Sequence, residues 1–183
     1  MVLVHGLSGS LRAMMSLVMT VELVIFVGLQ ALGKSTFFRE RFAATHEHVS
    51  KDLLRNNNNP NRRQAQLIQA ALEAGHSVVV DNTNPAIEDR RPLIELGHEH
   101  GARVVGYFFD ARVRESLRRN AGREGRARVP DVAIFAAAKR LIPPSYSEGF
   151  DALFRVRVAD DATFEVSAYT EASGSVPGAD SPE

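Results

Sequence analysis

Apolar residues are spaced along the chain in two ways, one typical of buried strands and the other of helices. Residues 21–27 form an apolar run of strand length in which Glu22 is the one polar residue, and a glycine-containing turn follows it. Further short apolar runs predict strands at residues 48–50, 76–81, 103–109 and 152–158, with a weaker one at 163–169. Helical spacing or composition predicts helices at residues 34–43, 60–74, 86–100, 111–120 and 132–140.

This alternation of strands and helices predicts an α/β fold with three layers and a mostly parallel central sheet. In such folds helices cover both faces of the sheet, and ligands bind at the carboxyl ends of the strands. We therefore look for chemistry in the residues that directly follow each predicted strand.

The predicted domain covers residues 21–169 and has an extension at each end. We interpret residues 1–20 as a non-essential N-terminal extension rather than a targeting signal. The chain could equally start at one of three later methionines, Met14, Met15 or Met19. Residues 170–183 are rich in Ser, Gly, Ala, Pro and acidic residues, which predicts a disordered tail.

Positive and negative charges balance, with Lys+Arg 22 and Asp+Glu 22, so the formal net charge is +0. The balance argues against a protein that holds nucleic acid by bulk charge alone, while a local surplus stays open. With 44% hydrophobic residues the chain is not wholly disordered, and without cysteine it has neither disulfides nor thiolate zinc sites. Glu22 interrupts the N-terminal apolar stretch, so we expect a cytoplasmic protein with no membrane partner.

Residues 28–36 read GLQALGKST and match the phosphate-binding motif G-x-x-x-x-G-K-[ST]. The motif follows a buried strand and opens a helix, so backbone N–H groups of the loop and helix point at phosphate oxygens. Lys34 is expected to reach the β- and γ-phosphates of ATP, and the Ser35 hydroxyl to bind Mg²⁺. If Ala31 needs a positive φ, the loop carries some strain. The predicted nucleotide-binding residues here are Gly28, Gly33, Lys34, Ser35 and Thr36.

A second candidate feature is the segment that begins with Asp81 and reads DNTNP, directly after an apolar strand. Such a carboxylate is common at the end of an ordinary strand. Beside a phosphate loop, however, it can hold Mg²⁺ directly or through water, so Asp81 and Ser35 are the predicted metal ligands. The polar residues after Asp81 offer further donors at the same rim, although they are also ordinary turn residues.

Residues 50–55, SKDLLR, form a third candidate feature. A kinase needs a carboxylate near the acceptor hydroxyl to orient it and accept its proton, and Asp52 follows a short strand. Arg55 lies one helical turn later and could bind an anionic part of the acceptor. On spacing alone, a helix-capping Asp with an exposed ion pair to Arg55 explains these residues better.

Arginines are concentrated between residues 112 and 128, a segment with few acidic residues. Arginine is suited to clamping a transferring phosphoryl group, and Gly122 and Gly125 would let the segment move, so we predict an arginine-rich lid. The first two arginines are better explained as a solvated helix face. The cluster consists of Arg112, Arg114, Arg118, Arg119, Arg123, Arg126 and Arg128.

Two His-Glu-His triplets, at residues 46–48 and 98–100, resemble metal-binding patterns. Zinc usually needs three or four converging ligands, and the sequence does not show such convergence. We interpret the histidines as surface and helix-end residues, and we expect no metal other than Mg²⁺.

These features, in this order, resemble the kinase domain of the polynucleotide kinase family, a branch of the P-loop phosphotransferases. The resemblance runs through residues 28–36, 51–55 and 81–85. It continues through Arg119-Asn120, Arg123 and Val129-Pro130, and then Pro144 and Glu148-Gly149-Phe150, and covers about residues 21–158. It implies a P-loop kinase fold with an arginine-rich helical lid over ATP and Mg²⁺.

The resemblance also implies an activity, namely transfer of the γ-phosphate of ATP to a 5′-hydroxyl of DNA or RNA. Asp52 would then be the general base, Arg55 would contact the neighbouring phosphate of the acceptor, and Thr83 would line the acceptor side. Lys34 and Arg123 would act on the phosphates of ATP, and Arg119 would support the lid.

Two other functions stay open on the sequence. The chain could be a kinase for a small hydroxyl acceptor such as a nucleoside, sugar or antibiotic. It could also be an ATP-binding module that changes conformation and phosphorylates nothing. A pure switch has no use for a base facing an acceptor, so the role of Asp52 distinguishes it from the two kinases.

Overall fold

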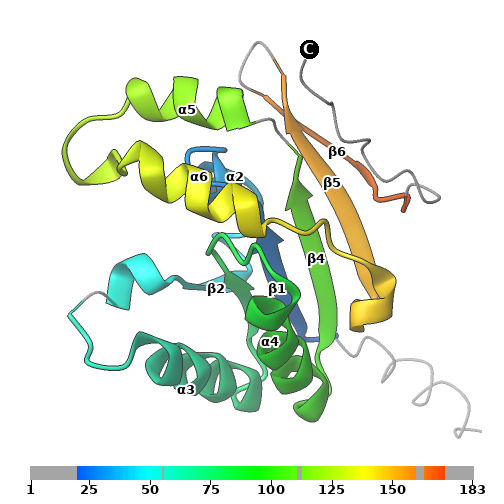
Figure 1. Ribbon diagram of the computed structural model, residues 1–183. Coiled ribbons are helices and arrows are strands. Elements are labelled where there is room, and N and C mark those ends of the chain that lie inside the picture. Colours follow the sequence, from blue (N-terminus) through cyan, green and yellow to red (C-terminus); the bar gives the residue numbers. More distant parts are fainter. Residues whose placement is uncertain (1–19, 55, 111–112, 160–162, 172–183) are drawn as a thin grey trace, which may run out of the picture.

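The computed structural model describes residues 20–54, 56–110, 113–159 and 163–171 (Figure 1). Arg55 and Arg112 therefore lie outside the described residues, as do the extensions at 1–19 and 172–183. The strands are β1 (Glu22–Val27), β2 (His46–Val49), β3 (Ser77–Val80), β4 (Arg103–Phe109), β5 (Ala152–Val158) and β6 (Phe164–Ala168). The α-helices are α2 (Lys34–Arg41), α3 (Pro60–Glu73), α4 (Ile87–Glu99), α5 (Val113–Ala121) and α6 (Asp131–Arg140). Short 3₁₀ helices are η1 (Lys51–Leu54), η2 (Gly125–Ala127) and η3 (Tyr146–Glu148).

The six strands form one sheet in the order β2-β3-β1-β4-β5-β6. All neighbouring pairs are parallel except β5 and β6, which are antiparallel. The predicted mostly parallel α/β sheet is therefore confirmed. All the parallel strands end at the same edge of the sheet, and α5 and α6 lie together beyond that edge (Figure 1). Among the described residues, no helix is long and apolar enough to cross a membrane.

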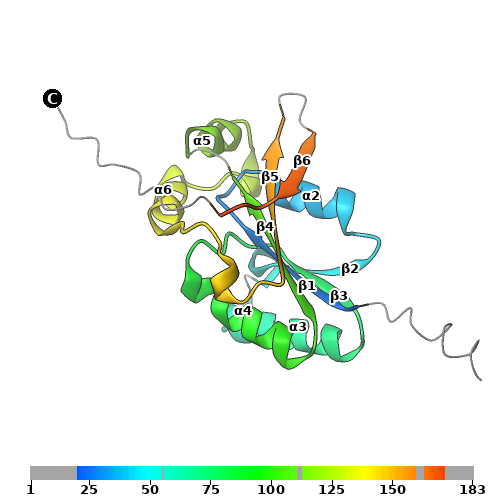
Figure 2. The same ribbon diagram turned by 90° about the vertical axis from the view of Figure 1, so that its right-hand side faces the viewer.

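Strand β1 is the centre of the core because both of its faces are buried. Leu23, Ile25 and Val27 pack in the cluster that contains residues of α3 and α4. Val24 and Phe26 point the other way, into a second cluster with residues of α2 and α6. In Figure 2, α2 lies on the opposite side of the sheet from α4. A continuous apolar run is the pattern expected of such a strand, since helices exclude water from both of its faces.

Strand β2 begins earlier than its sequence predicts, at His46 instead of His48, and it ends at Val49. It pairs with β3 alone and forms one edge of the sheet. Polar side chains are tolerated in an edge strand. The first two residues of β2, His46 and Glu47, are polar, so a search for apolar runs does not include them in the strand. The weaker strand predicted at residues 163–169 is present as β6, the opposite edge.

Arg90 of α4 is fully buried and joins three segments of the chain. Its Nε and Nη2 donate to the two carboxylate oxygens of Glu148, at 2.7 and 2.8 Å. Its Nη1 donates to the carbonyls of Asn84, Pro85 and Ile142. The guanidinium thus ties the loop after β3 to the segment that follows α6.

We expect Arg90→Met to lower the free energy of unfolding by about 3–5 kcal/mol, because the substitution leaves the Glu148 carboxylate buried without its partner. Chemical denaturation with urea measures this loss. Arg103→Met is the matched control, since the Arg103 pair with Glu22 is partly exposed and such pairs contribute about 0–1 kcal/mol. Equal losses for the two variants would contradict the role assigned to Arg90.

Candidate active site

The loop between β1 and α2 has the shape of a phosphate cradle. Gly33 adopts a left-handed conformation, φ 81°, at the N-cap of α2. No side chain in the described part of the protein caps this helix through a hydrogen bond. Its first N–H groups are therefore available to an anion at the positive end of the helix dipole. The N–H of Gly28 is not available in the same way, because it donates to the carbonyl of Thr83 at 2.9 Å.

Ala31 has a φ of 60°, the left-handed region that a side chain disfavours. The sequence analysis predicted strain in this loop if Ala31 has a positive φ, and this is the conformation observed. The neighbouring residue is fixed from outside, since the Ser116 hydroxyl of α5 donates to the carbonyl of Gln30 at 2.6 Å. Helix α5 thus helps to hold the phosphate loop in its conformation.

Lys34 lies inside this loop and is 8% exposed. Its ammonium donates to the carbonyls of Gly28 and Leu29. Burial lowers the pKa of Lys34 from 10.5 to about 8; Asp81 acts against this shift, Arg123 adds to it, and Asp52 acts weakly against it. A side chain held in this way can turn from the loop carbonyls to a phosphate, and its charge is sensitive to what fills the cavity.

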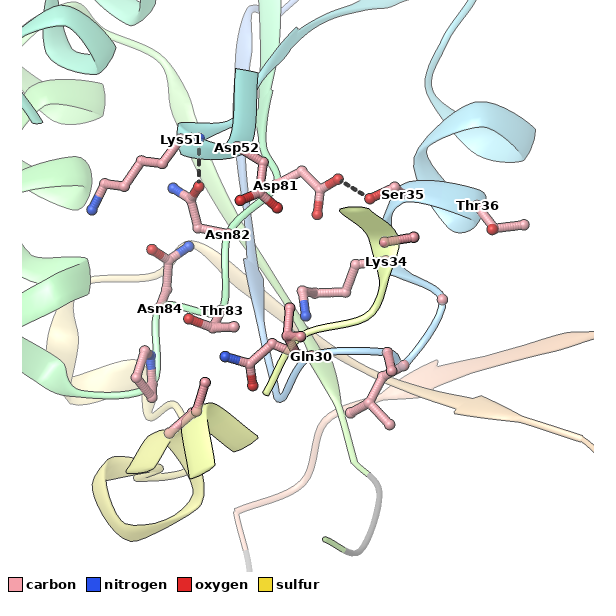
Figure 3. Close-up of a pocket in the computed structure, with 18 of the residues that line it drawn as sticks. Gln30, Lys34, Ser35, Thr36, Lys51, Asp52, Asp81, Asn82, Thr83 and Asn84 are labelled. Carbon is pink, nitrogen blue, oxygen red and sulfur yellow. Dashed lines mark hydrogen bonds between the residues drawn. The ribbon is translucent and has the colours of Figure 1, made fainter. Parts of the chain in front are cut away.

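Ser35 and Asp81 come together as predicted, at the start of α2 and directly after β3. The Ser35 hydroxyl donates to Oδ2 of Asp81 at 2.6 Å (Figure 3). The pKa of Asp81 lies below its ordinary value: burial acts to raise it, and hydrogen bonds from His48 and Ser35 together with the charge of Lys34 lower it by more. An ionised carboxylate beside a hydroxyl oxygen is a donor set that suits Mg²⁺, which prefers oxygen ligands and retains several waters.

His48 is a third partner of this pair, which the sequence analysis missed. Its Nε2 lies 3.1 Å from Oδ2 of Asp81, and its ring stacks on Phe38 of α2 with centroids 4.1 Å apart. The interpretation of His48 as a surface histidine is wrong in this respect. The position of His48 near the end of its strand could have indicated this contact. Strands β2 and β3 are parallel and end side by side, and His48 stands opposite Val79 in their register.

Asp52 is positioned through the backbone of Asp81. The Ser50 hydroxyl donates to the carbonyl of Asp81 at 2.9 Å, and the N–H of Asp52 donates to the same Ser50 oxygen at 3.3 Å. Asp52 and Asp81 both line the central cavity, at the same end of it in Figure 3. Asp52 lies in the first turn of the short helix η1, and Arg55, its ion-pair partner in the capping alternative, lies outside the described residues.

A second hydrogen-bond chain holds the same segment from the side of α3. The N–H of Lys51 donates to Oδ1 of Asn82 at 2.9 Å (Figure 3), and Nδ2 of Asn82 donates to Oε1 of Gln64 at 2.8 Å. Gln64 is buried on α3, on the face it shares with Ile68 and Ala71. A polar residue on an apolar helical face was the signal that could have identified Gln64.

The site residues surround a cleft of about 810 Å³. Eight of the predicted residues line it, with the phosphate loop on one side and the residues after β2 and β3 on the other; six of them are Gly33, Lys34, Ser35, Thr36, Asp52 and Thr83. Asp81 and Arg123 line it as well. Two predicted nucleotide-binding residues, Gly28 and Arg119, are not among the lining residues.

The segment predicted to be the lid consists of α5, the loop containing η2, and α6. Asn120 closes the loop, since its amide donates to the carbonyl of Val129 and to Asp131, and its Oδ1 accepts from the N–H of Val129. Arg123 extends from this loop to the cleft and donates to the carbonyl of Ala127 at 3.3 Å. Arg119 instead forms an ion pair with Glu115 on its own helix, at 2.7 Å.

Residues 23–144 match the model of the AAA_33 family, described as an AAA domain. The chain is also 29% identical over 136 residues to a bifunctional polynucleotide phosphatase/kinase of Schizosaccharomyces pombe. That match covers 70% of this chain and 32% of the relative, so the chain spans about a third of the relative's length.

Two solved structures share the fold. A fungal RNA kinase superposes with a TM-score of 0.56 and 18% identity, over 75% of this chain and 38% of the other. A gluconokinase from Sinorhizobium meliloti 1021 has a TM-score of 0.56 and 18% identity, over 76% of this chain and 83% of the other. These likenesses confirm the P-loop kinase fold that the resemblance implied, and the relationship supports ATP-dependent phosphotransfer. The chain belongs to the AAA_33 family of P-loop kinase domains.

Proposed function

We propose that the chain is an ATP-dependent kinase whose acceptor is the 5′-hydroxyl end of a polynucleotide. The observation that carries the proposal is the position of Asp52, which lines the same cleft as Lys34 and the Ser35–Asp81 pair. A carboxylate opposite a phosphate loop is what a phosphotransferase needs, since an acceptor hydroxyl must lie between the base and the transferring phosphoryl group.

The nucleotide side of the cleft supplies charge to the phosphates of ATP. The N–H groups at the start of α2 bind phosphate oxygens, and the Lys34 ammonium turns from the loop carbonyls to the β- and γ-phosphates. Arg123 reaches the cleft from the lid and adds positive charge near the phosphoryl group that is transferred. Ser35 and Asp81 would hold Mg²⁺, which when bound neutralises phosphate charge.

On the acceptor side, Asp52 orients the hydroxyl and takes its proton. The acceptor oxygen forms a bond to the γ-phosphorus while the bond from that phosphorus to the bridging oxygen of ADP breaks. Thr83 and Lys51 line this part of the cleft and can bind polar and anionic groups of the acceptor. Arg55, proposed to bind its neighbouring phosphate, lies outside the described residues.

The choice of a polynucleotide rests on the sequence relationship to the polynucleotide phosphatase/kinase and on the cationic side chains around the cleft. Five cationic side chains line it, Lys34, Arg39, Lys51, Arg123 and Arg140, against the three carboxylates of Asp52, Asp81 and Asp89. Arg140 pairs with Asp89, so a small positive surplus lies at the cleft in a chain of net charge +0. The gluconokinase likeness spans most of both chains, so a small hydroxyl acceptor is the second candidate. The proposed location of the protein, the cytoplasm, stays a prediction.

Labelled ATP and Mg²⁺, offered with a 5′-hydroxyl oligonucleotide beside nucleosides and sugars, identify the acceptor. We expect label at the 5′ end of the oligonucleotide, and no label when that end already carries a phosphate. Label on a small acceptor but not on the oligonucleotide would contradict the proposed substrate and favour the second candidate. ATP binding with no labelled product on any acceptor would favour a switch module.

We expect Asp52→Asn to lower kcat by roughly 10²–10⁴-fold, the usual contribution of a general base, with ATP affinity little changed. Single-turnover phosphorylation and isothermal titration calorimetry measure the two quantities. Glu165→Gln, an exposed carboxylate on β6, is the matched control and should leave both unchanged. Full phosphotransfer by Asp52→Asn on every accepted substrate would show that another group is the base.

The pKa of Lys34 predicts how ATP binding depends on pH. With a pKa of about 8 in the free protein, Lys34 loses its ammonium charge as the pH rises past that value, so kcat/KM for ATP should fall above about pH 8. Bound phosphates favour the charged form, so kcat should persist to higher pH. Lys34→Arg stays charged and should remove this pH dependence of ATP binding. An ATP affinity that is constant from about pH 7 to 9.5 would contradict the assignment.

A further inference from the structure

Oδ2 of Asp81 accepts hydrogen bonds from two sides, and only one of the donors belongs to the proposed reaction. Ser35 donates from the phosphate loop at 2.6 Å, and His48 approaches from β2 at 3.1 Å. His48 is not among the residues that line the cleft. An ionised carboxylate can only accept, so Nε2 of His48 is the donor in this contact.

The imidazole is held in place by a second contact, to the helix that carries Ser35. Its ring stacks on Phe38 with an interplanar angle of 16°. Phe38 follows Ser35 by three residues on α2, so both side chains lie on one face of that helix. Ser35 therefore contacts Asp81, and Phe38 contacts His48. Because His48 also contacts Asp81, these side chains link α2 to the ends of β2 and β3.

We propose that His48 is a positioning residue for the divalent cation of the proposed kinase. By donating to Oδ2 it fixes the rotation of the Asp81 carboxylate, so that the other oxygen, Oδ1, is presented to the cation that accompanies ATP. A side chain that orients a metal ligand usually changes metal affinity 10–100-fold when it is removed. The proposal rests on the proposed function for the identity of the cation, and it assigns His48 no part in proton transfer.

His48→Phe keeps a ring against Phe38 and removes the donor, and His48→Gln restores a donor at about the position of Nε2. His76→Phe is the matched control, because His76 is 61% exposed and pairs with Glu47. ATP affinity is measured by isothermal titration calorimetry at a series of Mg²⁺ concentrations and again with EDTA. This readout needs no acceptor and no phosphotransfer.

We expect the Mg²⁺ concentration that gives the half-maximal gain in ATP affinity to rise about 10–100-fold in His48→Phe. It should stay near the wild-type value in His48→Gln and His76→Phe, and affinity in EDTA should be the same for all four proteins. If His48→Phe does not fold, His48→Met, which is apolar and flexible, takes its place, and a thermal melt identifies that case.

An unchanged Mg²⁺ requirement in a folded His48→Phe protein would overturn the proposal. So would an equal loss of affinity with and without Mg²⁺, since that result assigns His48 to the packing of the phosphate loop instead. The proposed function fails separately: a shifted Mg²⁺ requirement with no labelled oligonucleotide would support His48 as the positioning residue and reject the polynucleotide acceptor.

Discussion

The arrangement of the site depends on how Asp81 is held at the end of β3. Every polar group of this residue has a partner from another segment: its N–H donates to Val49, its carbonyl accepts from Ser50, and its carboxylate accepts from Ser35 and His48. The residue therefore joins the phosphate loop to the end of β2, the segment that leads to Asp52. The proposed nucleotide and acceptor sides are thus placed relative to each other by a single carboxylate and its peptide group.

The elements around this contact are themselves held in place by the core and by buried polar contacts. Strand β1 is buried on both faces, so the phosphate loop begins from the centre of the core. The lid is fastened at both ends of its arginine-rich loop by Asn120, and the segment after α6 is held by Arg90, which also contacts the loop after β3. Burial of Arg90 is tolerable because Glu148 and three carbonyls satisfy its donors.

The sequence predicted the α/β alternation and the phosphate loop, because both depend on neighbouring residues and their spacing. It also predicted that Asp81 would meet Ser35, since parallel strands end at one edge of a sheet. It did not predict His48, Gln64 or Arg90, whose partners are 33, 18 and 58 residues away and which read locally as polar surface residues. Which of the two named lid arginines lies at the cleft also depended on tertiary structure: Arg123 lines it, while Arg119 does not and pairs with Glu115 on its own helix.

The central claim is that one carboxylate holds the ATP side and the acceptor side in register, with Asp52 facing the acceptor hydroxyl. A crystal structure of the chain with a non-hydrolysable ATP analogue, Mg²⁺ and a 5′-hydroxyl oligonucleotide tests it most directly. We expect the 5′ oxygen within hydrogen-bond distance of Asp52 and in line with the γ-phosphorus, with Asp81 still bonded to Ser35 and His48. An acceptor oxygen held by another side chain, with Asp52 turned away from the cleft, would contradict the claim.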